Sequence, residues 1–315
     1  MRYNIVMFLK EPIVCRKLIY EIKNANIKTP VRVALTNDWH VSKIVSDKQY
    51  QMLKKKFLEI KPDVIILQGD LFDTPNSFDD VKLVAELKRR LKMCVKIAPT
   101  VMVLGNHDQI EPTHKTPKSH VDFVKRVRSG VIEEWRSLCK ECGVKLLLDE
   151  WFEIKDLRIF GMLQDPEMFY VAPGKKGENI SMMHRHIQEL SHEGALKFKS
   201  GKVHWFATHA PINDLYKMRE LSGFDAFSFG HTHGGCVPIL IDVIVDACGG
   251  HGGIIAPFSK WFPTKHMRGR EKLKNGTNYI VNTGMVMTQN SAPELLHYIN
   301  FLKSAEVTEV DILPE

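Results

Sequence analysis

Residues 224–233 read Phe224-Asp225-Ala226-Phe227-Ser228-Phe229-Gly230-His231-Thr232-His233, a mostly apolar run that ends in two histidines. Side chains at positions i and i+2 of an extended strand lie on the same face, so both imidazoles are expected to point toward one place. Imidazole is a common ligand of divalent transition metals. This pair indicates a metal site only if other parts of the chain supply further ligands.

Four earlier apolar runs end in the same kinds of polar residue. The runs at 31–35, 64–67, 101–104 and 203–207 are followed by Asp38 and His40, by Gly69-Asp70 and Asp73, by Gly105-Asn106-His107-Asp108, and by His209. In α/β sheets, ligands bind outside the carboxyl ends of the strands. The sequence therefore predicts that these polar side chains meet one another and the two histidines of the first stretch.

Helical patterns separate the predicted strands, and together they indicate an α/β fold. Helices are predicted over 44–60, 77–93, 120–142 and 181–199, further strands over 144–148, 157–162, 279–282 and 306–313, and loops over 109–120, 165–180 and 256–278. No internal repeat, low-complexity tract or linker interrupts the chain. We therefore predict a single domain over 1–315, with a strand-and-helix lead-in at 1–29 and closing strands and a basic loop within 234–315.

The composition is that of an ordinary globular protein, with 44% apolar and 26% charged residues in a chain of 315. The net charge of +7 is modest, so it indicates a polyanionic partner only weakly and leaves nucleic acid open as a partner. No apolar run approaches the length of a membrane span, and the first ten residues are too short an apolar run for a signal peptide. Peripheral membrane contact stays open.

Six cysteines are spread through the chain, and only Cys139 and Cys142 form a C-x-x-C pair. No second pair completes a zinc site, and Cys139 falls in a helical pattern, so we interpret the pair as helix packing. Reduced thiols are typical of cytoplasmic proteins, and a cytoplasmic location is therefore predicted.

The five polar blocks, taken in order over 31–233, resemble the signature of the calcineurin-like metallophosphoesterases. The resemblance implies a four-layer αββα sandwich, in which two mixed sheets lie face to face and helices cover the outside. It also implies a metal-dependent phosphoric ester hydrolase with a dinuclear metal centre. Two cations about 3.5–4 Å apart can clamp both ends of an in-line displacement at phosphorus.

Residue by residue, the resemblance implies that Asp38, His40 and His233 hold one metal ion. It implies that Asn106, His209 and His231 hold the other, and that Asp70 bridges the two. Ligands of this mixed kind suit Mn, Fe, Zn or Co better than calcium, and the sequence does not choose among these four.

The same resemblance implies that a metal-bridging hydroxide attacks a phosphodiester or pyrophosphate bond in line. His107 resembles the histidine that hydrogen-bonds a phosphate oxygen and protonates the leaving oxygen. Asp73 and Asp108 are expected to orient histidines or backbone. His184 and His186 repeat the His-x-His spacing but fall in a helical pattern, where positions i and i+2 diverge, and His251 is interpreted as a loop histidine.

Two subfamilies are candidates. The blocks at 38–40 and 69–73 are similar to those of the SbcD-type DNA repair nucleases, although only about 80 residues follow His233, which leaves little room for their capping and DNA-binding parts. The blocks at 230–235, 266–269, 279–284 and 292–294 look like the YkuE/YaeI-type bacterial phosphoesterases, some of which act on lipid-linked pyrophosphates or other phosphodiesters. Cys236 stands where that group usually has Gln, and the N-terminal anchor of many members is missing, which weakens the transfer of a lipid substrate.

A third alternative is a non-catalytic scaffold of the same fold. Scaffolds of this kind are expected to lose metal ligands, whereas every ligand position and His107 are kept here. The sequence therefore favours a phosphodiester- or pyrophosphate-cleaving enzyme over a DNA repair nuclease, and both over a scaffold.

Overall fold

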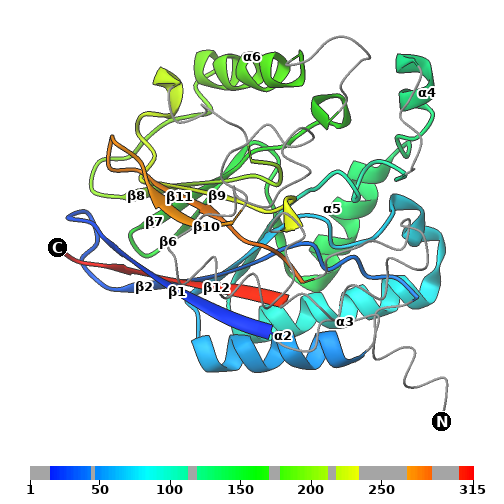
Figure 1. Ribbon diagram of the computed structural model, residues 1–315, viewed down its shortest axis with the longest axis horizontal. Helices are drawn as coiled ribbons and strands as arrows, with labels where there is room; N and C mark the ends of the chain where they lie inside the picture. Colours follow the sequence, from blue (N-terminus) through cyan, green and yellow to red (C-terminus); the bar gives the residue numbers. More distant parts are fainter. Residues whose placement is uncertain are drawn as a thin grey trace.

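Two mixed sheets of six strands each form the centre of the molecule (Figure 1). The computed structural model describes residues 15–43, 47–112, 119–169, 178–211, 218–233, 268–285 and 305–315. In spatial order the first sheet contains β1 (Cys15–Lys23), β12 (Ala305–Leu313), β2 (Val31–Thr36), β3 (Val64–Gln68), β4 (Thr100–Val103) and β5 (Lys145–Leu146). The second contains β10 (Gly269–Lys272), β11 (Asn278–Val281), β9 (Ala226–Phe229), β8 (Val203–Ala207), β7 (Leu157–Gly161) and β6 (Glu150–Ile154).

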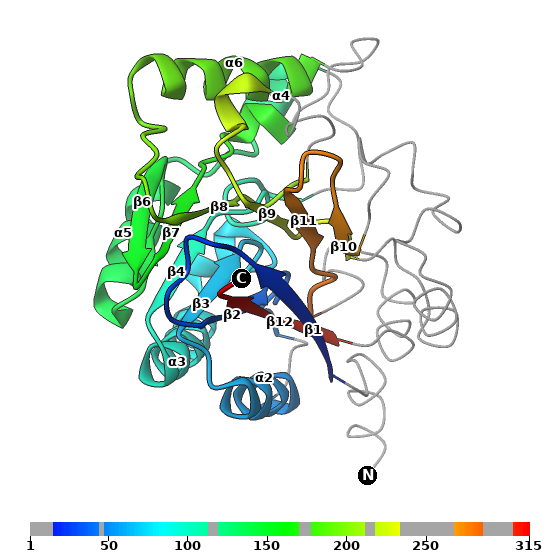
Figure 2. The ribbon, with the colours of Figure 1, turned by 90° about the vertical axis from the view of Figure 1, so that its left-hand side faces the viewer.

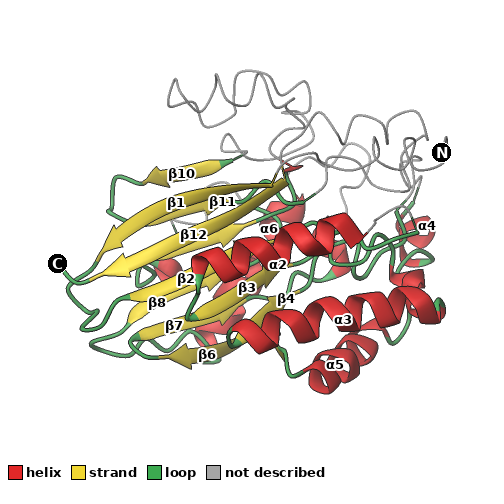
Figure 3. Cartoon of the chain, turned by 90° about the horizontal axis from the view of Figure 1, so that it is seen from below, coloured by secondary structure: helices red, strands yellow, loops and turns green. Residues whose placement is uncertain are grey.

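Helices cover the outer faces of both sheets. Figure 3 shows α2 (Asp47–Ile60), α3 (Val81–Ile97) and α5 (Val131–Cys142) together on the outside of the first sheet. The second sheet is covered by α6 (Glu178–His192), which overlaps the short α4 (His120–Val124) in the view of Figure 2 but lies apart from it in Figure 1. Among the described residues, none of the helices combines the length and the apolar character that crossing a bilayer requires.

The burial pattern of the strands explains the layers. In β2, Val33 and Leu35 pack between the two sheets, whereas Ala34 packs under the helices of the first sheet. Strand β3 divides in the same way, with Ile66 between the sheets and Ile65 beneath the helices. Both faces of these strands are buried, as continuous apolar runs indicate. The predicted α/β sandwich of two mixed sheets with outer helices is thus confirmed.

The predicted helix over 120–142 is wrong, because the chain forms two helices there. The first ends at Val124, and the second begins at Val131 after Gly130, which has a φ of 74°. Such a backbone conformation suits glycine and interrupts an α-helix. Between the helices, the backbone N–H of Arg128 donates to the carbonyl of Gln109, so this segment is held by the loop that follows β4.

Several strands also differ from expectation. Strand β6 was not predicted, β5 is shorter than 144–148, and β10 lies inside the predicted loop 256–278. The predicted closing strand near the C-terminus is present as β12, but it lies inside the first sheet, parallel to β1 and antiparallel to β2. The expected helix of the N-terminal lead-in is absent from its described residues, 15–29, which contain β1.

Candidate metal centre

The predicted ligands follow strands of both sheets whose ends meet at one edge. The loops after β2 and β3 are joined by backbone hydrogen bonds from Asp38 N to Gly69 O (3.0 Å) and from His40 N to Asp70 O (3.1 Å). His209, after β8, donates from Nδ1 to the carbonyl of Gln68 at 2.6 Å, which ties the second sheet to the first. A side chain at Gly69 would collide with the His209 ring and with the backbone of residue 105, so glycine is required there.

Asp38, His40 and His233 form the first group. Asp38 Oδ1 lies 3.7 Å from His40 Nε2 and 3.5 Å from His233 Nε2. The two imidazole rings stack with their centroids 5.2 Å apart. Two atoms that are each about 2.1 Å from one ion lie roughly 3–4 Å from each other. The three ligand atoms therefore have the spacing that a single bound cation needs.

Asp70, His209 and His231 form the second group. Asp70 Oδ2 lies 3.1 Å from His209 Nε2, and His209 Nε2 lies 3.2 Å from His231 Nδ1. Asn106 is next to His107, whose backbone N–H donates to Asp70 Oδ1 at 2.8 Å. Asp70 Oδ2 is also 3.9 Å from His40 Nε2, so this carboxylate lies between the two groups.

Unpaired buried atoms show that the site suits cations. Five of them belong to four predicted ligands and lack a hydrogen-bond partner among the described residues: Asp38 Oδ1, His40 Nδ1, His40 Nε2, Asp70 Oδ2 and Asn106 Oδ1. A buried polar atom left without a partner costs about 1–3 kcal/mol. Carboxylate, amide and imidazole atoms donate electron pairs to divalent metal ions. Bound ions would therefore satisfy Asp38 Oδ1, His40 Nε2, Asp70 Oδ2 and Asn106 Oδ1, while His40 Nδ1 faces Asp73 Oδ1 at 3.3 Å.

The carboxylates control the protonation of the imidazoles. Burial opposes the charged form of His40, yet Asp38 and Asp73 outweigh it and raise its pKa to about 10. Burial is likewise outweighed at His209, where Asp70 raises the pKa to about 9. At His231, burial and then the charge of His209 lower the pKa to about 3. The carboxylates therefore favour positive charge in the site. Without bound metal ions, the protonated imidazoles of His40 and His209 carry that charge.

His107 is buried beside the first group. Its Nδ1 donates to the backbone carbonyl of Asp73 at 2.8 Å, since a carbonyl can only accept. Its ring meets that of His40 edge to face, with centroids 4.8 Å apart. Burial lowers the pKa of His107, although the charge of Asp70 opposes this. With Nδ1 fixed, Nε2 is the nitrogen that can exchange a proton with a substrate.

Asp73 and Asp108 hold the surrounding groups in place. Asp73 Oδ1 lies 3.3 Å from His40 Nδ1, which leaves His40 Nε2 to face the other ligands. The carboxylate of Asp108 accepts four backbone N–H groups, from Asp70 (2.8 Å), Gly105 (2.9 Å), Leu71 (3.0 Å) and Phe72 (3.2 Å). Asp108 thereby fixes the loop of Asp70 against the loop of Asn106 and His107.

Five of the seven predicted ligands have a left-handed backbone, with φ of 50° at Asp38, 43° at His40, 53° at Asp70, 66° at His231 and 48° at His233. This conformation is uncommon for residues other than glycine and gathers at functional sites. It also corrects the strand argument for the two histidines. Strand β9 ends at Phe229, and His231 faces His209 whereas His233 faces Asp38, so the pair serves both groups instead of one.

Sequence reasoning missed residues that contact the ligands without resembling ligands. Asn37 Nδ2 donates to Asp38 Oδ2 and to the carbonyl of Asn282. The ring of Phe169 lies 6.1 Å from that of His231, centroid to centroid. Only the position of Asn37 beside Asp38 offered a signal, because an aromatic residue in a predicted loop carries none.

The histidines set aside by the sequence analysis do not join these groups. His186 belongs to α6, and its Nε2 lies 3.1 Å from Asp149 Oδ2, which directly precedes β6. His184 belongs to none of the three clusters found in the described part of the chain, the third being His40, Asp73 and His107. His251 lies outside the described residues.

Comparison with protein families matches residues 31–235 to the family described as calcineurin-like phosphoesterase. A dimetal phosphatase from Danio rerio is 12% identical, with 85% of this chain and 90% of that one covered at a TM-score of 0.42. The phosphopantetheinyl hydrolase of Mycobacterium tuberculosis is 10% identical, with 79% and 87% covered at 0.39. A nuclease from Pseudomonas putida is 15% identical, with 42% and 55% covered at 0.27.

Proposed function

Since the chain belongs to the calcineurin-like phosphoesterase family and is a metal-dependent phosphoester hydrolase, we propose that it cleaves a phosphodiester or pyrophosphate bond at two divalent ions. The observation that carries this proposal is the position of Asp70 between two ligand groups. Its Oδ2 lies 3.9 Å from His40 Nε2 and 3.1 Å from His209 Nε2. One carboxylate within reach of both groups is what a dinuclear centre needs.

In this proposal Asp38, His40 and His233 hold one ion, and Asn106, His209 and His231 hold the other. When bound, two such ions lower the pKa of water toward neutrality and neutralise the phosphoryl oxygens. Asp73 keeps His40 in the orientation that presents Nε2, and the carbonyl of Gln68 does the same for His209. These contacts spare the enzyme the cost of ordering the ligands during turnover.

His107 is proposed to donate a proton to the leaving oxygen from Nε2, which carries this proton in the imidazolium form, because the proton on Nδ1 is held by the carbonyl of Asp73. The carbonyl of Asp73 fixes the ring through Nδ1, so Nε2 is directed to one place. Positioned proton transfer of this kind contributes roughly 10²–10⁴-fold to rate. The ring contact with His40 puts His107 beside the first ligand group.

A cytoplasmic location is part of the same proposal. The four cysteines of the described residues, at 15, 94, 139 and 142, are free and buried. Cys139 packs into the core under α5, and its Sγ lies 3.8 Å from Met102 Sδ. Reduced, buried thiols suit a reducing compartment.

Removal of metal is expected to abolish turnover of bis(p-nitrophenyl) phosphate. In this proposal the nucleophile is water activated by the metal ions, so the loss should be complete after chelation. Adding back Mn, Fe, Zn or Co one at a time, with metal content measured in parallel, tests which ions restore the rate. Purified protein that binds no transition metal and stays inactive with added Mn would favour a non-catalytic scaffold instead.

Substrate comparison separates the esterase from the nuclease. We expect simple aryl phosphodiesters to be hydrolysed faster than single- or double-stranded DNA. DNA cleavage is measured over a range of salt, since contacts to phosphates make binding fall steeply with ionic strength. Robust DNA cleavage with that salt dependence would replace the present proposal by an SbcD-type nuclease activity.

Metal binding is expected to release protons and to weaken as the pH falls. The pKa of His40 is raised to about 10 and that of His209 to about 9, so both carry a proton at pH 7 before metal binds. A ligand nitrogen must lose this proton, which makes the apparent affinity rise with pH up to about pH 9–10. Calorimetry in buffers of different ionisation enthalpy measures the released protons. A metal affinity that does not change between pH 6 and 9 would show that the pKa values of His40 and His209 are not raised in this way.

A further inference from the structure

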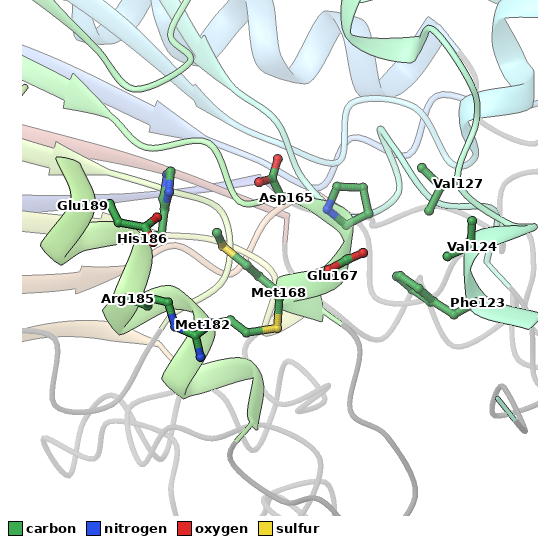
Figure 4. A pocket seen from close by; sticks show the side chains of 11 residues that line it. Phe123, Val124, Val127, Asp165, Glu167, Met168, Met182, Arg185, His186 and Glu189 are labelled. Atoms are coloured by element: carbon green, nitrogen blue, oxygen red, sulfur yellow. The ribbon is translucent and has the colours of Figure 1, made fainter. Parts of the chain in front are cut away.

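A cavity of about 490 Å³ lies between α4, the short 3₁₀ turn Pro166–Phe169 and α6 (Figure 4). Phe123, Val124 and Val127 line one side, and Met182 of α6 lines the other. Met168 lies between them. The volume of the cavity is in the range of small-molecule sites, which are mostly apolar with a few polar groups at the edge.

One wall of this cavity is tied to the loop that carries Asn106 and His107. Ile110 pairs with Val127 in an antiparallel bridge, and the backbone N–H of Glu111 donates to the carbonyl of Arg126 at 2.8 Å. The backbone N–H of Arg128 donates to the carbonyl of Gln109 at 3.1 Å. These bonds attach the wall containing Val127 to the loop that follows Asn106 and His107.

The 3₁₀ turn connects the other side of the cavity with the second ligand group. Met168 lines the cavity, and the next residue, Phe169, lies against the rings of His231 and His209, with centroids 6.1 and 6.4 Å apart. His120 on α4 lies 3.3 Å from Glu167 of the turn, which joins the two sides. The turn Pro166–Phe169 therefore separates the cavity from the second ligand group, with Met168 toward the cavity and Phe169 toward His231 and His209.

The charges of the lining argue against a second phosphate in this cavity. Among the described residues that line it, three carry carboxylates, Asp165, Glu167 and Glu189, and one carries a guanidinium, Arg185. The imidazole of His186 is already held by Asp149 at 3.1 Å. A nucleic-acid strand would bring further phosphates toward these carboxylates, whereas an uncharged or cationic group meets no repulsion.

We propose that this cavity binds the apolar organic group of the phosphoester, so that the substrate is a small amphipathic phosphoester without a second phosphate beyond the scissile bond. The inference rests on the proposed function, because the phosphoryl group is assigned to the candidate metal centre. It adds the substrate class and names the residues that select it. Phe123, Val124, Val127, Met168 and Met182 supply the apolar contacts.

A phosphonate series tests this directly, since a C–P bond is not hydrolysed. Methylphosphonate, 2-phenylethylphosphonate and 4-phenylbutylphosphonate are titrated into the metal-loaded enzyme by calorimetry. Burying one phenyl ring in an apolar cavity is expected to tighten binding by about 10-fold or more over methylphosphonate. Kinetics with methyl and 4-phenylbutyl p-nitrophenyl phosphate should show the same preference in kcat/KM.

Two variants of one helix provide a matched pair. Val124 lines the cavity and is 47% exposed, whereas Val121 of the same helix is 63% exposed and is not among the lining residues. V124W is expected to fill the cavity and remove most of the roughly 10-fold phenyl preference, with methyl substrates changed by less than about 2-fold. V121W should keep the preference. Metal content and thermal unfolding of both variants show that the fold is intact.

The outcomes distinguish the inference from the function on which it rests. If methylphosphonate binds and the phenyl group adds nothing, or if V124W weakens all ligands equally, the cavity does not select the organic group. If no member of the series binds the metal-loaded enzyme, both the proposed function and the inference are wrong. Faster cleavage of an oligonucleotide than of the phenylbutyl diester would also overturn the inference.

Discussion

Replacing Asp70 by asparagine is expected to lower kcat by about 10³-fold or more, which corresponds to roughly 4 kcal/mol of lost transition-state stabilisation. Oδ2 of this carboxylate lies 3.1 Å from His209 Nε2 and 3.9 Å from His40 Nε2. An amide N–H₂ at that point cannot bind a cation and removes the negative charge that both groups share. Metal content, measured with turnover of bis(p-nitrophenyl) phosphate, should fall together with the activity.

The substitution should leave the loop in place, because Oδ1 can still accept the backbone N–H of His107. A matched control is D225N, at a carboxylate that accepts the backbone N–H of His204 and the side chain of Asn24 away from the ligands. We expect this control to keep metal and activity. A D70N enzyme that retained two metals and near-normal turnover would remove Asp70 from its bridging role.

The variant H107N is expected to keep its metal content and to lose roughly 10²–10⁴-fold in turnover of substrates with poor leaving groups. His107 is not among the predicted ligands, and its Nδ1 is occupied by the carbonyl of Asp73. Proton donation matters most when the leaving oxygen is basic. Turnover of an alkyl ester should therefore fall much further than turnover of a p-nitrophenyl ester.

His204 offers the matched histidine control. It is buried near the start of β8, at the opposite end of the strand from His209, and its Nε2 accepts the backbone N–H of Lys199. H204N should leave the ratio of the two substrates unchanged. Equal losses on good and poor leaving groups in H107N would show that this histidine only orders the site and does not act as an acid.

The α/β character of the fold and the meeting of polar side chains at strand ends could be predicted from local pattern, whereas the two-sheet sandwich and the assignment of ligands came from the resemblance to a family. Runs such as 64–67 are apolar on both faces, so they identify parallel strands buried between layers. Carboxyl ends of parallel strands meet at one edge, so Asp70 and Asn106 had to lie close to each other. Simple spacing was enough for this part of the site.

Other features depend on pairings that no local pattern reports. The left-handed backbone of His231 and His233 sends the two rings to different groups, which a strand-based argument could not foresee. The break in the predicted helix over 120–142 follows from Gly130 and from the hydrogen bond of Arg128 to Gln109. The contact of Phe169 with His231 joins segments about 60 residues apart in a chain of 315 and has no signature in composition.

The interior position of β12 has a consequence for how the protein is made. This strand pairs with β1 on one side and with β2 on the other, and Glu306 at its start accepts the Thr283 hydroxyl and donates its own N–H to Gly284 O. The ribosome makes β1 and β2 long before β12, so both strands lack their pairing partner during most of synthesis. Until the chain has passed residue 285, the Asp38 loop also lacks the 282–285 segment, whose Met285 N–H donates to Asn37 O. Nascent chains that stall before residue 305 should therefore expose an unpaired strand edge and depend on chaperones until β12 has been made.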